Sequence, residues 1–160
     1  MKSKKIHIVP FAIISFALLV VDYIVKYLIR TNMQEGDSIV LIKGFLRISF
    51  VKNKGAVFGI LQNNVLVFSV LSVIAIAVIV FLFVTKKITN NFYAFALLLI
   101  LSGAIGNFLD RIFLGYVVDM IDFYGIWPFV FNVADCCVVI GVLLIIFCEI
   151  LGLFTKKSED

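Results

Sequence analysis

The chain has 160 residues, of which 63% are hydrophobic and only 15% charged, and its formal net charge is +4. A soluble domain of this size could not carry such a composition without exposing large apolar patches, so the sequence predicts a membrane protein. The positive charge does not indicate a nucleic-acid-binding protein, because the basic residues do not gather on one stripe.

Four apolar runs are long enough to cross a bilayer as helices, which takes about 20 residues each. They comprise residues 8–29, 65–84, 92–109 and 134–154. The first run contains Asp22 and Lys26 and ends without a small-residue cleavage site, so we interpret it as a span rather than a signal peptide. The fold class is therefore an all-α membrane protein, and residues 1–160 form a single domain.

Lysines flank these spans in three clusters. They are Lys2, Lys4 and Lys5 before the first span, Lys86 and Lys87 after the second, and Lys156 and Lys157 after the fourth. Under the positive-inside rule all three clusters lie in the cytoplasm, as do both termini. Segments 30–64 and 110–133 then face outward, where we expect the chemistry.

The two outward segments differ in pattern. In the first, Leu46, Ile48 and Phe50 alternate with polar residues and are followed by Gly55 and Gly59, which predicts a small sheet at the outer surface. The second is rich in aromatic residues that favour the membrane interface, and it predicts a partly buried loop or short helix. These residues are Trp127, Phe129 and Phe131, with Pro128 among them.

The residues exclude most enzyme chemistries. The only histidine is His7, in the leader, so neither a histidine-type metal site nor a Ser/His or Cys/His nucleophile is available. Ser102 has no histidine to activate it. A serine/lysine dyad with Lys26 is the weaker alternative, because Lys26 already has Asp22 on the same helix face. No cofactor is expected.

Carboxylates remain, and five lie near the outer ends of spans or in the outward segments. They are Asp22, Asp110, Asp119, Asp122 and Asp135. Buried charge at such depth is expensive and usually functional, although each group taken alone fits a cap or an ion pair. Asp22 has Lys26 one turn on and Asp110 precedes Arg111, so both fit structural charge networks. Asp119 has no such neighbour, and spacing leaves its partner open between Asp122 and Asp135.

Two facing carboxyl groups have a well-understood chemistry. Like charges a few ångströms apart cannot both ionise, so one group holds a proton while the other is basic. The basic group takes a proton from water, and the acid polarises a carbonyl group. Such a pair would make the chain a hydrolase.

Four sequence blocks resemble those of a known family and fall in the family's order. They read Asp-Tyr-Ile-Val-Lys at 22–26, Asn-Lys-Gly-Ala-Val-Phe-Gly at 53–59, Gly-Ala-Ile-Gly-Asn-Phe-Leu-Asp-Arg at 103–111 continuing through Gly-Tyr-Val-Val-Asp at 115–119, and Phe-Asn-Val-Ala-Asp at 131–135. The chain resembles lipoprotein signal peptidases (signal peptidase II) along essentially its whole length.

The resemblance implies an intramembrane aspartyl endopeptidase with Asp119 and Asp135 as the catalytic dyad. The implied substrate is a bacterial prolipoprotein whose cysteine carries diacylglycerol, cleaved just before that cysteine. The enzyme is then expected in the bacterial cytoplasmic membrane, in contact with lipid, as a monomer, with its active site near the extracytoplasmic face. The matched supporting or substrate-binding residues are Asn53, Gly55, Asn107, Arg111, Asn132, Asp22 and Lys26.

Two other function classes were weighed. A small transporter or channel with ion-binding carboxylates needs a polar stripe through the membrane, but the second span offers only Ser69 and Ser72. Glu149 is the one inner carboxylate, about 21 Å of helix from Asp135. A non-catalytic assembly subunit would not need the cluster of outer polar residues.

Overall fold

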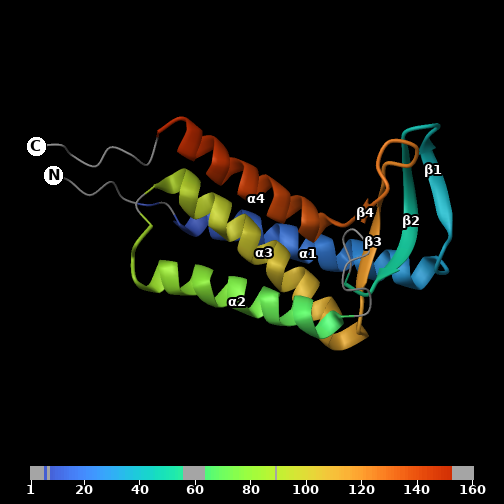
Figure 1. Cartoon of the computed structure of the whole chain (residues 1–160), viewed down its shortest axis with the longest axis horizontal. Helices are drawn as coiled ribbons and strands as arrows, with labels where there is room; N and C mark the ends of the chain where they lie inside the picture. The colour runs from blue at the N-terminus through green and yellow to red at the C-terminus, as the bar shows by residue number, and fades with distance from the viewer. Residues whose placement is uncertain (1–5, 7, 56–63, 89, 153–160) are drawn as a thin grey trace, which may run out of the picture.

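Four helices form a bundle with a small sheet at one end (Figure 1). The structure is a computed structural model, and it describes residues 6, 8–55, 64–88 and 90–152. The helices are α1 (Ile8–Asn32), α2 (Val65–Val84), α3 (Asn91–Leu114) and α4 (Val133–Ile150). Each is long and apolar enough to cross a membrane, which confirms the four predicted spans. Helix α3 runs five residues past its predicted end, so Asp110 and Arg111 belong to the helix.

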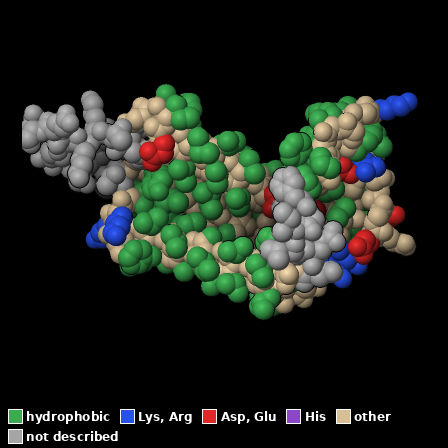
Figure 2. Space-filling view, in the orientation of Figure 1, with side chains coloured by type: hydrophobic (Ala, Val, Ile, Leu, Met, Phe, Trp, Pro, Cys, Tyr) green, Lys and Arg blue, Asp and Glu red, His purple; other side chains and the backbone are tan. Residues whose placement is uncertain are grey.

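The helical surface is apolar where a soluble protein would be polar. Hydrophobic side chains cover the bundle and charged ones gather at its two ends (Figure 2). Leu66, Val84 and Phe113 are each at least 74% exposed. In hydrocarbon every backbone polar group must be satisfied within the chain, and helices do this segment by segment. Lipid is therefore the solvent for this surface.

The sheet has four antiparallel strands in the order β1-β2-β3-β4. Strands β1 (Ser38–Ile42) and β2 (Leu46–Asn53) come from the first outward segment, which confirms the predicted sheet. Strands β3 (Val117–Asp122) and β4 (Val130–Phe131) come from the second. The expectation of a loop there holds for residues 123–129, but the strands on either side of it were not predicted.

One face of the sheet packs on the bundle. Phe50, Val118 and Met120 are buried there together, against side chains of α1 that include Val25 and Ile29. Because side chains alternate along a strand, Val117 and Asp119 point to the opposite face of β3. This alternation aims Asp119 away from the apolar contact with α1.

Glycines let α3 and α4 approach closely. A Cβ atom at Gly103 would overlap the carbonyl oxygen of Ala134, and one at Gly141 would lie 2.7 Å from that of Ala96. Small residues commonly permit such contacts between membrane helices. The close approach places the first turn of α4 beside the C-terminal half of α3.

Several predicted residues lie outside the described part of the chain. They are Lys2, Lys4, Lys5, His7, Ala56, Val57, Phe58, Gly59, Lys156 and Lys157, and the predicted end of the fourth span at residue 154 lies there too.

We expect Gly103→Ala to destabilise the protein by roughly 1–3 kcal/mol, because the added methyl group forces α3 and α4 apart. The measurement is the melting temperature in detergent micelles. Ala77→Val is the control, since it adds more volume on an exposed part of α2 and should leave melting unchanged. Equal melting temperatures for Gly103→Ala and the wild type would contradict the close contact.

Candidate active site

Asp119 lies on β3 and is 1% exposed. Both of its carboxyl oxygens accept hydrogen bonds from amide side chains. Asn53 Nδ2, from the end of β2, donates to Oδ2 at 2.8 Å, and Asn132 Nδ2 donates to Oδ1 at 2.6 Å. Asn53 is held in turn by its Oδ1, which accepts from the backbone N–H of Gly55 at 2.9 Å. The predicted residues Asn53 and Gly55 are thus brought to Asp119.

Asp135 lies in the first turn of α4, where it forms a capping box with Asn132. Asn132 Oδ1 accepts from the Asp135 N–H at 2.8 Å, and Asp135 Oδ2 accepts from the Asn132 N–H at 3.2 Å. The other carboxyl oxygen, Oδ1, accepts from Asn107 Nδ2 at 2.7 Å. The capping role expected for Asp135 is therefore present, together with a contact to α3 that capping does not require.

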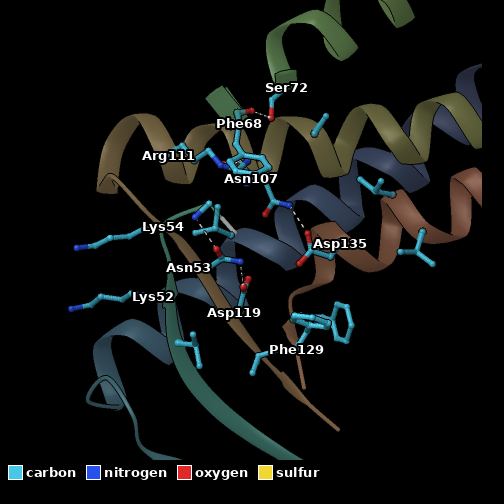
Figure 3. Close-up of a pocket in the computed structure, with 18 of the residues that line it drawn as sticks. Lys52, Asn53, Lys54, Phe68, Ser72, Asn107, Arg111, Asp119, Phe129 and Asp135 are labelled. Carbon is cyan, nitrogen blue, oxygen red and sulfur yellow. Dashed lines mark hydrogen bonds between the residues drawn. The ribbon is translucent and has the colours of Figure 1, made fainter. Parts of the chain in front are cut away.

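Asn132 connects the two carboxyl groups. Its side chain is completely buried, and its two ends serve different aspartates: Oδ1 caps the helix of Asp135 while Nδ2 donates to Asp119. Asp119 and Asp135 line the same cavity, and in Figure 3 both point into it. Two carboxyl groups in this arrangement can share a proton.

Asp122, the alternative partner for Asp119, forms hydrogen bonds with side chains of β2 instead. Its Oδ2 accepts from Arg47 Nε at 2.6 Å and from Ser49 Oγ at 2.9 Å, both on β2. Because side chains alternate along β3, Asp122 and Asp119 point to opposite faces of the strand, whereas Ile121 shares the face of Asp119. Asp122 therefore belongs to a structural pair within the sheet.

The cavity has a volume of about 900 Å³ and is lined by both polar and apolar side chains. Its polar lining includes the two aspartates, Asn53, Asn107 and Arg111. Its apolar walls come from α2, α3 and α4, and aromatic residues of the second outward segment line it too. The lining includes Phe68, Leu71, Ala75, Ile100, Ala104, Val138 and Val139 from the helices, and Trp127, Phe129 and Phe131 from that segment. The residues from α2 were not predicted, because nothing distinguishes them from other apolar side chains of that span.

Arg111 reaches the cavity from the last turn of α3. Its Nη1 donates to the Asn107 carbonyl oxygen at 3.3 Å, and its guanidinium lies 5.7 Å from the ring centre of Phe68. Its Nε is buried without a hydrogen-bond partner among the described residues. Arg111 thus keeps a donor that a bound molecule could use.

Asp22 and Lys26 are buried and form a charge cluster with the partly buried Asp110. Lys26 Nζ lies 2.8 Å from Asp22 Oδ2 and 3.2 Å from Asp110 Oδ2. The pairing of Asp22 with Lys26 was predicted. Asp110, by contrast, makes its ion pair with Lys26 rather than with its neighbour Arg111.

The buried position of Asp119 changes its acidity. Burial raises the pKa of Asp119 to about 7, from an ordinary value of 3.8, and the negative charge of Asp135 acts in the same direction. The hydrogen bonds from Asn53 and Asn132 and the charge of Lys26 oppose this increase. A carboxyl group with such a pKa can hold a proton at neutral pH. Within the described ranges, no group of three or more His, Cys, Asp or Glu side chains could hold a metal ion.

Comparison with known proteins identifies relatives over most of the chain. A family model described as signal peptidase (SPase) II matches residues 14–151. A protein of Fusobacterium nucleatum subsp. nucleatum, named lipoprotein signal peptidase, is 44% identical over 131 residues, which are 81% of this chain and 79% of that protein. A protein of the same name from Staphylococcus aureus (strain JH9) is 36% identical over 159 residues, 98% of either chain.

Two solved structures resemble the whole fold. Both are described as bacterial membrane enzymes determined by the in meso method, and both are 35% identical to this chain. One has a TM-score of 0.88 and covers 100% of this chain and 98% of its own. The other has a TM-score of 0.81, with coverages of 99% and 100%.

We expect the raised pKa of Asp119 to make stability depend on pH. The folded state holds the proton more tightly than the unfolded state, so the contribution of Asp119 is complete below about pH 4 and is lost as the pH rises through about 7. Melting temperatures in detergent between about pH 5 and 8 should therefore fall more steeply for the wild type than for Asp119→Asn, by several degrees over this range. Parallel curves for the two proteins would show that Asp119 has no raised pKa.

Proposed function

The chain belongs to the signal peptidase II family, and from this we propose that it is an aspartic endopeptidase that removes signal peptides from bacterial prolipoproteins, with Asp119 and Asp135 as its catalytic pair. The observation that carries the proposal is the buried amide of Asn132, which donates to one carboxyl group and caps the helix of the other. Both aspartates line one cavity whose other lining residues are partly polar and partly apolar.

The proposed reaction is hydrolysis by a shared-proton pair. The ionised aspartate accepts a proton from a water molecule as the water oxygen attacks the scissile carbonyl carbon, and the protonated aspartate gives its proton to the carbonyl oxygen. The proton taken from water then passes to the leaving nitrogen as the carbon–nitrogen bond breaks. The second proton returns from the tetrahedral hydroxyl group to the other aspartate, which restores the pair.

The shape of the cavity supports a substrate that remains in the bilayer. Its apolar walls on α2, α3 and α4 suit the hydrophobic part of a signal peptide, while Asn53, Asn107 and Arg111 offer polar groups to the backbone near the scissile bond. A diacylglyceryl chain on the cysteine would stay in lipid beside these walls. Cleavage immediately before that cysteine would then require the scissile bond to lie beside the two aspartates.

A transporter or channel is less well supported. The hydroxyl groups of Ser69 and Ser72 on α2 both donate to carbonyl oxygens of their own helix, at 2.8 and 2.9 Å. Such hydroxyls extend no polar path from the outer cluster toward the inner end of the bundle. The protease remains the better account of the site.

For orientation, we propose that the sheet and the dyad lie at the extracytoplasmic face and that both termini are cytoplasmic. Lys86 and Lys87 support this arrangement, since they follow α2 at the end of the bundle opposite the sheet. An active site at the outer face would meet prolipoproteins after their signal peptides have entered the membrane.

The catalytic proposal is tested by supplying a diacylglyceryl prolipoprotein to the purified protein in detergent. We expect Asp119→Asn and Asp135→Asn each to reduce cleavage by at least about 10³-fold, because an amide can neither activate water nor share the proton. Melting and gel filtration should show both variants folded. Asp122→Asn is the matched control, and it should stay within about tenfold of the wild type. Cleavage that survives either of the first two changes would remove that residue from the dyad.

The orientation is tested with single cysteines in a chain whose three native cysteines are replaced by alanine. We expect Lys43→Cys, in the exposed turn between β1 and β2, to react with a membrane-impermeant maleimide in intact cells. Lys87→Cys, exposed after α2, should react only after the cells are opened. The opposite pattern would reverse the proposed orientation.

A further inference from the structure

The buried ammonium group of Lys26 lies at the centre of a network that ends at both proposed catalytic residues. Lys26 is 3% exposed, and its three N–H donors have three partners: Asp22 Oδ2 at 2.8 Å, Asp110 Oδ2 at 3.2 Å and Asn107 Oδ1 at 2.9 Å. An ammonium group has three donors and no acceptor, so its hydrogen-bonding capacity is completely used.

Two of these partners hold the backbone next to the dyad. Asp22 Oδ1 accepts from the N–H of Ala134 at 2.8 Å, and Asp110 Oδ2 accepts from the N–H of Val118 at 3.1 Å. Ala134 immediately precedes Asp135, and Val118 immediately precedes Asp119. Lys26 therefore holds, through one carboxylate each, the chain segments that carry the two aspartates.

The third partner determines how an amide meets Asp135. Because the ammonium of Lys26 can only donate, Asn107 must turn its Oδ1 toward it, and its Nδ2 is then left to donate to Asp135 Oδ1 at 2.7 Å. A donor aimed at a carboxyl oxygen favours the ionised form of that group. Asp135 also lies in the first turn of α4, and the partial positive charge at the N-terminal end of a helix favours a negative charge there.

We propose that Lys26 is a positioning residue for the hydrolysis: by fixing the Asn107 amide with Nδ2 toward Asp135, it makes Asp135 the ionised member of the pair and Asp119 the protonated member. This inference rests on the proposed function. Asp135 then takes the proton from water and passes it to the leaving nitrogen. Asp119 gives its proton to the carbonyl oxygen and recovers it when the tetrahedral intermediate collapses.

The surrounding charges are consistent with this assignment. Lys26 from α1 and Arg111 from α3 act on both carboxyl groups, and Asp119 on β3 lies in addition in the field of Asp135. The remaining charged groups of the cluster, Asp22 and Asp110, are both paired with Lys26. What favours a negative charge on Asp135 is its place at the N-terminal end of α4, which Asp119 on β3 lacks.

The test uses the pH dependence of kcat/KM for cleavage of a diacylglyceryl prolipoprotein in detergent. For the wild type we expect a bell-shaped profile, with Asp135 on the acidic limb and Asp119 on the basic limb. Two matched variants each remove one amide donor. Asn107→Leu should move the acidic limb up by about 0.5–1 pH unit, and Asn53→Leu should move the basic limb up by a similar amount.

Lys26→Met completes the test. We expect kcat to fall roughly 10- to 100-fold with little change in KM, and the acidic limb to move up by about one pH unit, because both a charge and the orientation of Asn107 are lost. Lys43→Met, the same change at an exposed lysine of the β1–β2 turn, should leave the profile unchanged. If Lys26→Met does not fold in detergent, the profile of Asn107→Leu decides.

The outcomes separate this inference from the proposed function. If Asn107→Leu moves the basic limb and Asn53→Leu the acidic limb, the assignment is reversed and the inference fails. If Lys26→Met or Asn107→Leu loses activity while both limbs stay in place, Lys26 has only a structural role. In either case the protease itself stands, because only a wild type that does not cleave, or active Asp119→Asn and Asp135→Asn variants, would overturn it.

Discussion

Carboxyl groups withdrawn from water at the end of an apolar bundle must be fully hydrogen-bonded, and this requirement organises the half of the molecule that carries the sheet. An isolated buried charge is expensive, so each carboxylate here either has a cation or accepts several N–H donors. The side chain of Asn132 donates a hydrogen bond to Asp119 and also accepts one from a backbone N–H in the first turn of α4. The sheet, the glycine contact and the α4 cap all serve to bring these donors to their acceptors.

The helices and the sheet contribute different kinds of side chain to the cavity, and the same need for hydrogen bonds explains the difference. Helices satisfy their own backbone in lipid, so they can supply apolar walls but few free donors in the membrane interior. The sheet at one end of the bundle supplies polar side chains from strands: β3 carries Asp119 and β2 carries Asn53. A cavity with both polar and apolar lining results from joining these two kinds of element.

Much of this arrangement could be predicted from the sequence, and the rest depends on tertiary contacts. Hydropathy predicts the four spans, because a helix that crosses a bilayer needs a long apolar run. The alternation of apolar and polar residues predicts β2. The spacing of the aspartates along the chain could not show whether Asp122 or Asp135 lies beside Asp119. The difference between them is a tertiary contact, because Arg47 pairs with Asp122 across the sheet. The bond from Lys26 to Asp110 joins α1 to α3, so neighbours in sequence gave no sign of it.

The network around Lys26 also bears on how the chain is made. Asp22 and Lys26 enter the bilayer in α1, one helical turn apart, and their mutual pairing lowers the free energy of inserting both charges before other partners exist. Asn107 and Ala134 belong to segments synthesised much later. The hydrogen-bond network around Lys26 is therefore complete only once α3 and α4 have docked on α1.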